Sequence, residues 1–169
     1  MILDRDEYIE NGYTHVLPSA DYRIQLDEAK TLNFRYTTST REPSMTELQP
    51  FADNTNPIRT YIGNPNLTPE YSHSFNADYR FFDQFSFVNL FTYLRFSYTN
   101  DDIVQSRVVD EQALQTVMPV NIDHSWSTNG GLTYGRPIRS IGARINLNHS
   151  FHHRSEDRRV GKAGRPRGA

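Results

Sequence analysis

The sequence predicts an all-β protein, in which an antiparallel meander of about six strands forms part of a large transmembrane β-barrel. Several segments alternate apolar and polar residues with a period of two. Hydrophobic residues make up only 36% of the chain, yet aromatic residues make up 12%, as in a sheet with one apolar face. Short and long connections also alternate along the chain, which is typical of barrels in the outer membrane.

The clearest predicted strand runs over residues 71–81. One face of this strand carries Tyr71, His73, Phe75, Ala77, Tyr79 and Phe81, and the other carries Ser72, Ser74, Asn76, Asp78 and Arg80. Its length suits a tilted strand that crosses a membrane. The charges on the polar face favour a water-filled interior.

Three hairpins are expected, near residues 18–38, 71–98 and 124–151. Polar turns join their strands at 27–30, 82–84 and 136–140. Two long connections, 39–70 and 99–123, separate the hairpins. Brief turns at one end and long loops at the other are typical of outer-membrane barrels, whose long loops lie outside the cell.

Composition excludes several classes of protein. No run of about 18 apolar residues exists, so a transmembrane helix is excluded. The absence of cysteine excludes disulfides, zinc–thiolate sites and thiol nucleophiles. The opening, Met1–Tyr8, is too charged for a signal peptide, so an exported chain is expected to be a piece of a longer protein.

The last residues differ from the rest. Residues 154–169 contain six basic and two acidic side chains and no aromatic one. We expect a disordered basic tail that is not native to the barrel, whereas residues 1–153 form the partial barrel. Binding of nucleic acid by this tail is not expected.

The long loop contains a distinctive phrase, Gly63-Asn64-Pro65-Asn66-Leu67-Thr68-Pro69-Glu70, directly before the clearest strand. Gly63 would supply backbone freedom, the Asn-Pro and Thr-Pro pairs would fix turns, and Leu67 would pack the base of the loop. Four shorter phrases surround it: Val16–Ser19, Arg41–Ser44, Leu48–Phe51 and Asp102–Val104. Together these phrases resemble the outer-membrane barrel of TonB-dependent receptors over about residues 16–151.

The resemblance implies about 22 strands around a plug domain and location in the bacterial outer membrane. It implies that a complete receptor imports a nutrient or a metal chelate, such as a siderophore or a glycan. The partners implied are outer-membrane lipid, the receptor's own plug domain, the TonB system and a possible surface lipoprotein. Six strands cannot close such a barrel, so the chain is expected to be a fragment of its wall, with no enzymatic activity and no cofactor.

Charged residues on the polar strand faces are the candidate contacts with a plug or with the water-filled interior: Arg35, Asp78, Arg80 and Arg144. Pairing of these charges with one another along adjacent strands is an equal alternative. In the long loop, Arg41, Arg59 and Tyr61 are candidate contacts with an anionic or cyclic ligand.

Other constellations predict no site. His149, His152 and His153 point to both sides of a strand, so they do not converge on a metal. Gly130 and Gly131 lie within a strand and suggest a bulge or the close approach of a neighbour. The alternative fold is a soluble β-sandwich with a carbohydrate-binding or adhesin-like role, which would bury its apolar faces instead of exposing them to lipid.

Overall fold

In a computed structural model, which describes residues 14–56, 58–110 and 112–156, the strands form a single eight-stranded sheet. The elements in chain order are β1 (Ser19–Asp27), β2 (Lys30–Arg41), α1 (Met45–Leu48), β3 (Ala52–Asn56), β4 (Arg59–Ile62), β5 (Glu70–Phe82), β6 (Asn89–Val109), β7 (Gln115–Ile138) and β8 (Ala143–Glu156). All pairings are antiparallel except that of β4 with β7. The predicted all-β antiparallel class is confirmed.

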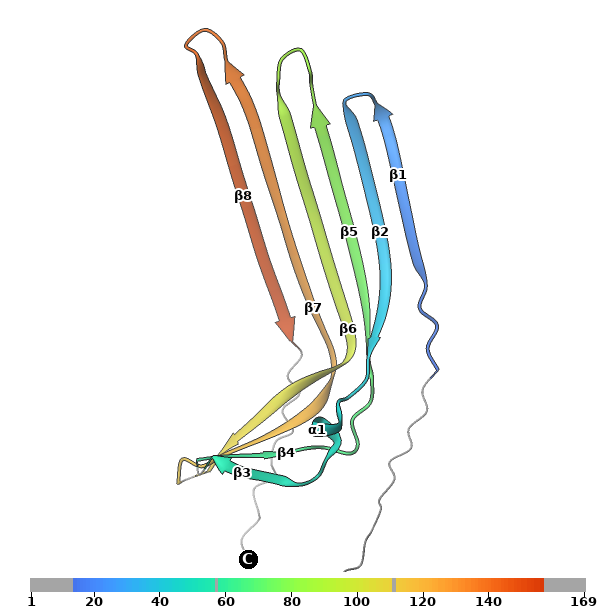
Figure 1. The fold of residues 1–169 in the computed structure, drawn as a ribbon, viewed down its shortest axis with the longest axis vertical. Helices are drawn as coiled ribbons and strands as arrows, with labels where there is room; N and C mark the ends of the chain where they lie inside the picture. Colours follow the sequence, from blue (N-terminus) through green and yellow to red (C-terminus); the bar gives the residue numbers. More distant parts are fainter. Residues whose placement is uncertain (1–13, 57, 111, 157–169) are drawn as a thin grey trace, which may run out of the picture.

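Six strands, in the order β1, β2, β5, β6, β7 and β8, form a wall of three hairpins that stand side by side (Figure 1). Their turns lie together at one end. The first turn is closed by Asp27, whose carboxylate accepts a hydrogen bond from the Ala29 amide at 2.9 Å and contacts Lys30 Nζ at 2.8 Å. A turn of this kind fixes the register of the whole hairpin.

The other two turns differ from the predicted ones. In the second hairpin, residues 83–88 form the turn, with Phe87 at a φ of 57°, so β6 begins at Asn89 and not at Phe85. In the third hairpin, residues 136–138 continue β7, and the turn occupies residues 139–142 with Gly142 at a φ of 64°. Pro137 is opposite Arg144, so a proline that suggested a turn lies at the end of a strand.

The second predicted long loop, residues 99–123, is mostly strand. Pairing of β6 with β7 continues from Asn89–Gly135 to Val109–Gln115, with a local irregularity at Asp101, whose φ is 51°. Beyond the wall this extension bends away and meets β3 and β4 (Figure 1). We call the outer ends of β6 and β7, together with α1, β3, β4 and residues 63–69, the cap.

The sheet has almost no core of its own. Among the described residues, the buried apolar side chains larger than alanine are those of Leu67, Pro69, Val117 and Pro119, all in the cap. Large apolar side chains of the wall, such as Phe34, Phe75 and Leu94, are exposed. A soluble sandwich would cover these residues with a second sheet, and the described residues form one sheet only.

Strand β8 continues to Glu156, so residues 154–156 belong to the wall and not to a disordered tail. The remainder of the predicted tail lies outside the described residues, as do residues 1–13 of the predicted barrel region. The one helix in the described part, α1, has four residues, and no described helix could cross a membrane.

Candidate functional site

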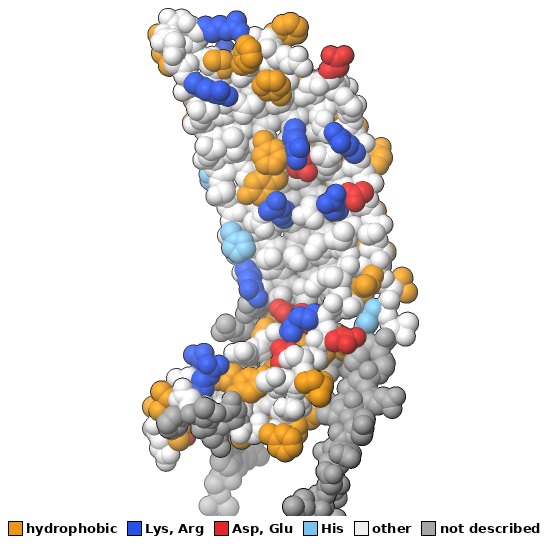
Figure 2. Space-filling model, in the orientation of Figure 1, with side chains coloured by type: hydrophobic (Ala, Val, Ile, Leu, Met, Phe, Trp, Pro, Cys, Tyr) orange, Lys and Arg blue, Asp and Glu red, His pale blue; other side chains and the backbone are white. Residues whose placement is uncertain are grey.

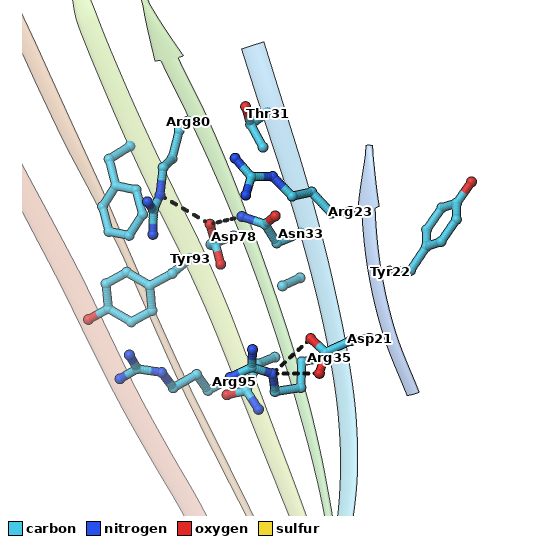
Figure 3. A pocket seen from close by; sticks show the side chains of 13 residues that line it. Asp21, Tyr22, Arg23, Thr31, Asn33, Arg35, Asp78, Arg80, Tyr93 and Arg95 are labelled. Carbon is cyan, nitrogen blue, oxygen red and sulfur yellow. Dashed lines mark hydrogen bonds and ion pairs between the residues drawn. The ribbon is translucent and has the colours of Figure 1, made fainter. Parts of the chain in front are cut away.

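One face of the wall carries a polar hollow of about 650 Å³ (Figure 3). We call this face the inner face. Strand register brings its charges together, because Asp21 is opposite Arg35, Arg35 is opposite Asn76, and Asn76 is opposite Arg95. Viewed from this side, basic and acidic side chains gather over the middle of the wall (Figure 2).

Two ion pairs lie in the hollow. Arg35 Nε is 2.9 Å from an Asp21 carboxylate oxygen, and Arg80 Nε is 3.3 Å from one of Asp78, which also accepts a hydrogen bond from Asn33 at 2.8 Å. The side chains of Arg35 and Asp21 are 62% and 67% exposed. Exposed pairs of this kind contribute at most about 1 kcal/mol. Either charge can therefore leave its ion pair and bind a different group at little cost.

Positive charge is in excess in this hollow. Among the described residues, neither Arg23 nor Arg95 has an acidic partner within the hollow's lining. Arg95 stacks over the Tyr93 ring at 4.9 Å, and Arg80 lies over the Phe91 ring at 5.6 Å. These cation–π contacts hold the guanidinium groups against the sheet, so the inner face offers arginines in fixed positions to an anionic or polar partner.

Of the predicted interior residues, Arg35, Asp78 and Arg80 line the hollow together. These charges form pairs, as one alternative predicted, and their contact with a plug or with a water-filled interior stays a prediction. Arg144 does not join them, since it lies near the turn end of β8 and its Nη2 donates to Asn89 Oδ1 at 3.2 Å. Prediction from the sequence missed Asp21 and Arg23, although both lie on the polar side of an alternating strand, and it missed Arg95, whose side of β6 also carries Phe91 and Tyr93.

The opposite face, which we call the outer face, carries a continuous series of aromatic rings. Tyr36 and Phe75 are 4.8 Å apart between ring centroids, and the series continues through Phe96 and Trp126 to His153 at spacings of 6.1, 6.2 and 5.1 Å. It crosses five strands near the end of the wall that meets the cap. Aromatic girdles of this kind mark the membrane interface of outer-membrane barrels.

The outer-face series includes further rings one row closer to the cap. Tyr71, His73, Tyr98 and His124 contact one another at centroid distances from 5.0 to 6.3 Å. The Tyr36 hydroxyl is hydrogen-bonded to His73 Nδ1 at 2.9 Å. We call these four residues and the five of the preceding series the aromatic belt.

The glycine pair within β7 fits between aromatic rings. A Cβ on Gly130 would lie 2.6 Å from the Phe151 ring on the outer face, and a Cβ on Gly131 would lie 2.7 Å from the Tyr93 ring on the inner face. Pairing continues without a bulge through both positions. The expected close approach is therefore confirmed and the expected bulge is wrong.

Where the wall meets the cap, Arg41 at the end of β2 forms a forked ion pair with Glu70 at the start of β5, with Nη2–Oε1 and Nε–Oε2 distances of 2.6 and 2.9 Å. Glu70 is 8% exposed and also accepts a hydrogen bond from the Ile103 amide at 2.8 Å. Burial raises the pKa of the Glu70 carboxyl, but the hydrogen bonds from Arg41 and Ile103 outweigh it, so the pKa is lowered. Arg41 also contacts Glu47 at 3.3 Å, so it joins the wall strands β2 and β5 to α1 of the cap.

Within the cap, the segment Gly63–Glu70 packs against the extension of β7. Leu67 is buried, the Asn64 side chain donates to the Pro119 carbonyl at 3.2 Å, and Thr68 and Asn121 exchange two hydrogen bonds of 2.9 and 3.0 Å. A Cβ on Gly63 would collide with the backbone carbonyl of Gln49. Gly63 is therefore required by close packing, and the backbone freedom expected for it is not used.

The other loop candidates lie on β4, away from the hollow. Arg59 and Tyr61 are opposite Gln115 and Val117 in the parallel pairing with β7. Arg59 is exposed, whereas Tyr61 is half-buried and its pKa is raised by burial and then by the charge of Glu47. Ligand contact by Arg41, Arg59 and Tyr61 stays a prediction. None of the three lines the hollow of the inner face.

No group of three or more potential metal ligands occurs within the part of the chain that the structure describes. His149 and His153 share a face of β8 with Phe151, and His152 lies on the opposite face. His153 instead packs against Trp126 in the aromatic belt. These observations leave the hollow of the inner face as the main concentration of chemically active side chains.

A protein-family model, described as an outer membrane protein β-barrel family, matches residues 3–163. The chain belongs to this family. Family membership agrees with a sheet that exposes its apolar face, and it confirms the predicted location in the bacterial outer membrane. Among curated proteins, no sequence matches.

Solved structures show the same barrel fold. The chain is similar to the siderophore receptor PirA from Acinetobacter baumannii, with a TM-score of 0.56 and 16% identity over 86% of this chain and 24% of the receptor. It is also similar to PirA from Pseudomonas aeruginosa, with a TM-score of 0.56 and 16% identity over 80% of this chain and 28% of the receptor. The chain thus spans about a quarter of the length of these receptors, and the similarity agrees with the resemblance that its loop phrases suggested.

Proposed function

We propose that the chain forms part of the barrel wall of a TonB-dependent receptor, which imports a nutrient or metal chelate such as a siderophore or a glycan. In this proposal the barrel has about 22 strands and encloses a plug domain, and the TonB system supplies the energy. The wall has no enzymatic role. A surface lipoprotein is the partner proposed at the cap.

The inner-face hollow is the observation that carries this proposal. Its arginines outnumber its carboxylates, it is open to water, and its ion pairs are weak enough to exchange. A plug domain needs a polar surface of this kind, because it must be held inside the barrel yet rearrange during transport. Complementary charges also fix the orientation of a docked partner.

Uptake measured in cells that produce the full-length protein tests the proposal. Candidate nutrients are ferric chelates and oligosaccharides, supplied singly as the limiting source. We expect uptake of one class to require both the protein and a functional TonB system. Uptake that continues unchanged after TonB is deleted would overturn the proposal.

Charge reversal tests the role of the hollow in the same cells. The double variant Arg23→Glu and Arg95→Glu is expected to lower uptake at least about tenfold, if two contacts of about 1 kcal/mol each are replaced by repulsion. Glu28→Lys, in the exposed turn between β1 and β2, is the control charge reversal and is expected to leave uptake unchanged. Equal uptake by the double variant and the wild type would exclude the hollow from transport.

A further inference from the structure

A second hollow, of about 330 Å³, lies on the outer face of the wall. Its lining includes Ala20, Phe34, Tyr36, Phe75, Ala77 and Phe96. It forms because Ala77 is small and its cross-strand neighbours, Phe34 and Leu94, are large. Its volume is at the lower end of the range for small-molecule pockets.

The position of this outer hollow limits what can fill it. It opens on the face that carries the exposed apolar side chains, and Phe34, Phe75 and Leu94 beside it are between 44% and 49% exposed. On an outer-membrane barrel this face contacts lipid. The surroundings of the outer hollow are therefore hydrocarbon, and a flexible hydrocarbon chain matches its apolar lining.

A polar group lies at the cap-side rim of the outer hollow. Tyr36 lines the hollow, and its hydroxyl is hydrogen-bonded to His73, which belongs to the aromatic belt. His73 is four residues from Ala77 on β5, or about 13 Å along the strand. An imidazole at this level can donate a hydrogen bond to a phosphate or carry a positive charge beside it.

We propose that the outer hollow binds one acyl chain of a phosphorylated outer-membrane lipid, with the phosphate of its head group held at His73 and Tyr36. The acyl chain packs against Phe34, Phe75 and Phe96 over Ala77. This site is independent of transport, since it lies on the face opposite the charged hollow. It would bind lipid whether or not the complete protein imports a nutrient.

The test measures lipid retained by the full-length protein, purified in detergent and mixed with bis-phosphorylated lipid A or its dephosphorylated analogue. Native mass spectrometry counts the lipids bound to each protein molecule. Ala77→Phe fills the outer hollow, and we expect at least about a tenfold loss of retained lipid, as when two or three methylene groups lose their contacts. Thr92→Phe adds the same ring at an outer-face position outside the hollow and is expected to retain lipid like the wild type.

Two more variants complete the test. His73→Gln keeps a hydrogen-bonding group beside Tyr36 but cannot become charged, so it should reduce the preference for the phosphorylated lipid. Phe34→Ala removes one wall of the hollow without adding bulk and should repeat the loss if Ala77→Phe fails to assemble. Unchanged retention by Ala77→Phe, an equal loss in Thr92→Phe, or an unchanged preference in His73→Gln would overturn the proposal.

Discussion

Glu70 is the residue on which most of the cap depends. It stands at the first position of β5, where the loop phrase ends, and it joins Arg41 of β2 to the Ile103 amide of β6. Its low exposure means that these bonds are protected from water. Removal of the carboxylate would leave the Ile103 amide without its acceptor and Arg41 with Glu47 as its remaining acidic partner.

Glu70→Ala is expected to destabilise the cap by about 2 kcal/mol, because hydrogen bonds to charged groups contribute roughly 1.5–3 kcal/mol and Arg41 remains partly solvated. Limited proteolysis of the intact protein in outer membranes would show faster cleavage within residues 41–69. Glu42→Ala, one residue from Arg41 and exposed, is the control. Equal cleavage rates in the two variants would contradict this role for Glu70.

The same carboxyl makes the cap sensitive to acid. The pKa of Glu70 is lowered in the folded protein, so its contribution is complete above the pKa of the unfolded chain and is lost as the pH falls through the lowered value. We expect the cap to be equally resistant to an acid-tolerant protease at pH 7 and pH 6 and to become labile below the usual titration range of glutamate. Glu70→Gln should abolish most of this dependence, and a loss of resistance between pH 7 and pH 6 would argue against Glu70.

Gly63 is needed for a different reason. Gly63→Ala would force its new methyl group into the carbonyl of Gln49, a backbone group that cannot turn aside, so we expect a cost of about 1–3 kcal/mol. Gly130→Ala is the matched control, because there the methyl group chiefly meets the end of the exposed Phe151 side chain and not a backbone group. Faster proteolysis of the cap in Gly63→Ala than in Gly130→Ala is the expected result. The opposite order would show that backbone contact at Gln49 is unimportant.

At the level of elements, alternation predicted the wall strands well where one face meets lipid. Within β5, for example, the faces assigned from sequence are those of the structure, with Phe75 outside and Asp78 inside. The inner face of β6 mixes the aromatic residues Phe91 and Tyr93 with Arg95, so alternation alone does not assign it. Both rings contact arginines of the same face, Tyr93 with Arg95 of its own strand and Phe91 with Arg80 of β5, and only the second contact depends on the register of two strands.

The extension of β6 and β7 was not predicted, and the reason is physical. Beyond the membrane neither face of a hairpin needs to be apolar, so residues 99–109 and 115–123 show no clear alternation. Pairing there is specified by the continuous ladder that begins in the wall. Alternation of apolar and polar residues marks a strand only where one face contacts lipid and the other contacts water.

An arginine placed on the two faces of β5 should have opposite effects on assembly. Phe75→Arg faces lipid, where an arginine costs about 2–4 kcal/mol at the midplane and less near the interface, so the amount of heat-modifiable, detergent-resistant barrel should fall. Ser74→Arg faces the interior between Thr37 and Ser97 and should assemble normally. Asn76 is a poorer control, because it lies between Arg35 and Arg95. Equal assembly of the Phe75 and Ser74 variants would exclude lipid contact by Phe75.

At the scale of the whole molecule, the described sheet is open, since β1 pairs only with β2 and β8 pairs only with β7. Unpaired strand edges cannot be satisfied in hydrocarbon. We therefore expect the 169-residue chain, produced alone, to give no heat-modifiable monomer in detergent. The full-length protein, measured in parallel, should give one, and a stable monomeric barrel from the shorter chain would contradict the open sheet.

The charged hollow shows what a single sequence leaves undetermined at this scale. Arg35, Asp78 and Arg80 could be assigned to the interior from their own strands, but their assembly with Asp21, Arg23 and Arg95 depends on the pairing of four strands. Alternation gives the face of each residue and not its height on the wall. The height follows from the turns, such as the one that Asp27 closes.

The parallel pairing of β4 with β7 has a consequence for the order of folding. Each wall hairpin joins strands that are neighbours in the chain, so its contacts are local and form quickly. Residues 59–61 and 115–117, in contrast, are separated by the whole β5–β6 hairpin, and their contact carries the entropic cost of closing a long loop. The wall can therefore grow hairpin by hairpin, while the cap has to wait until β7 has been added.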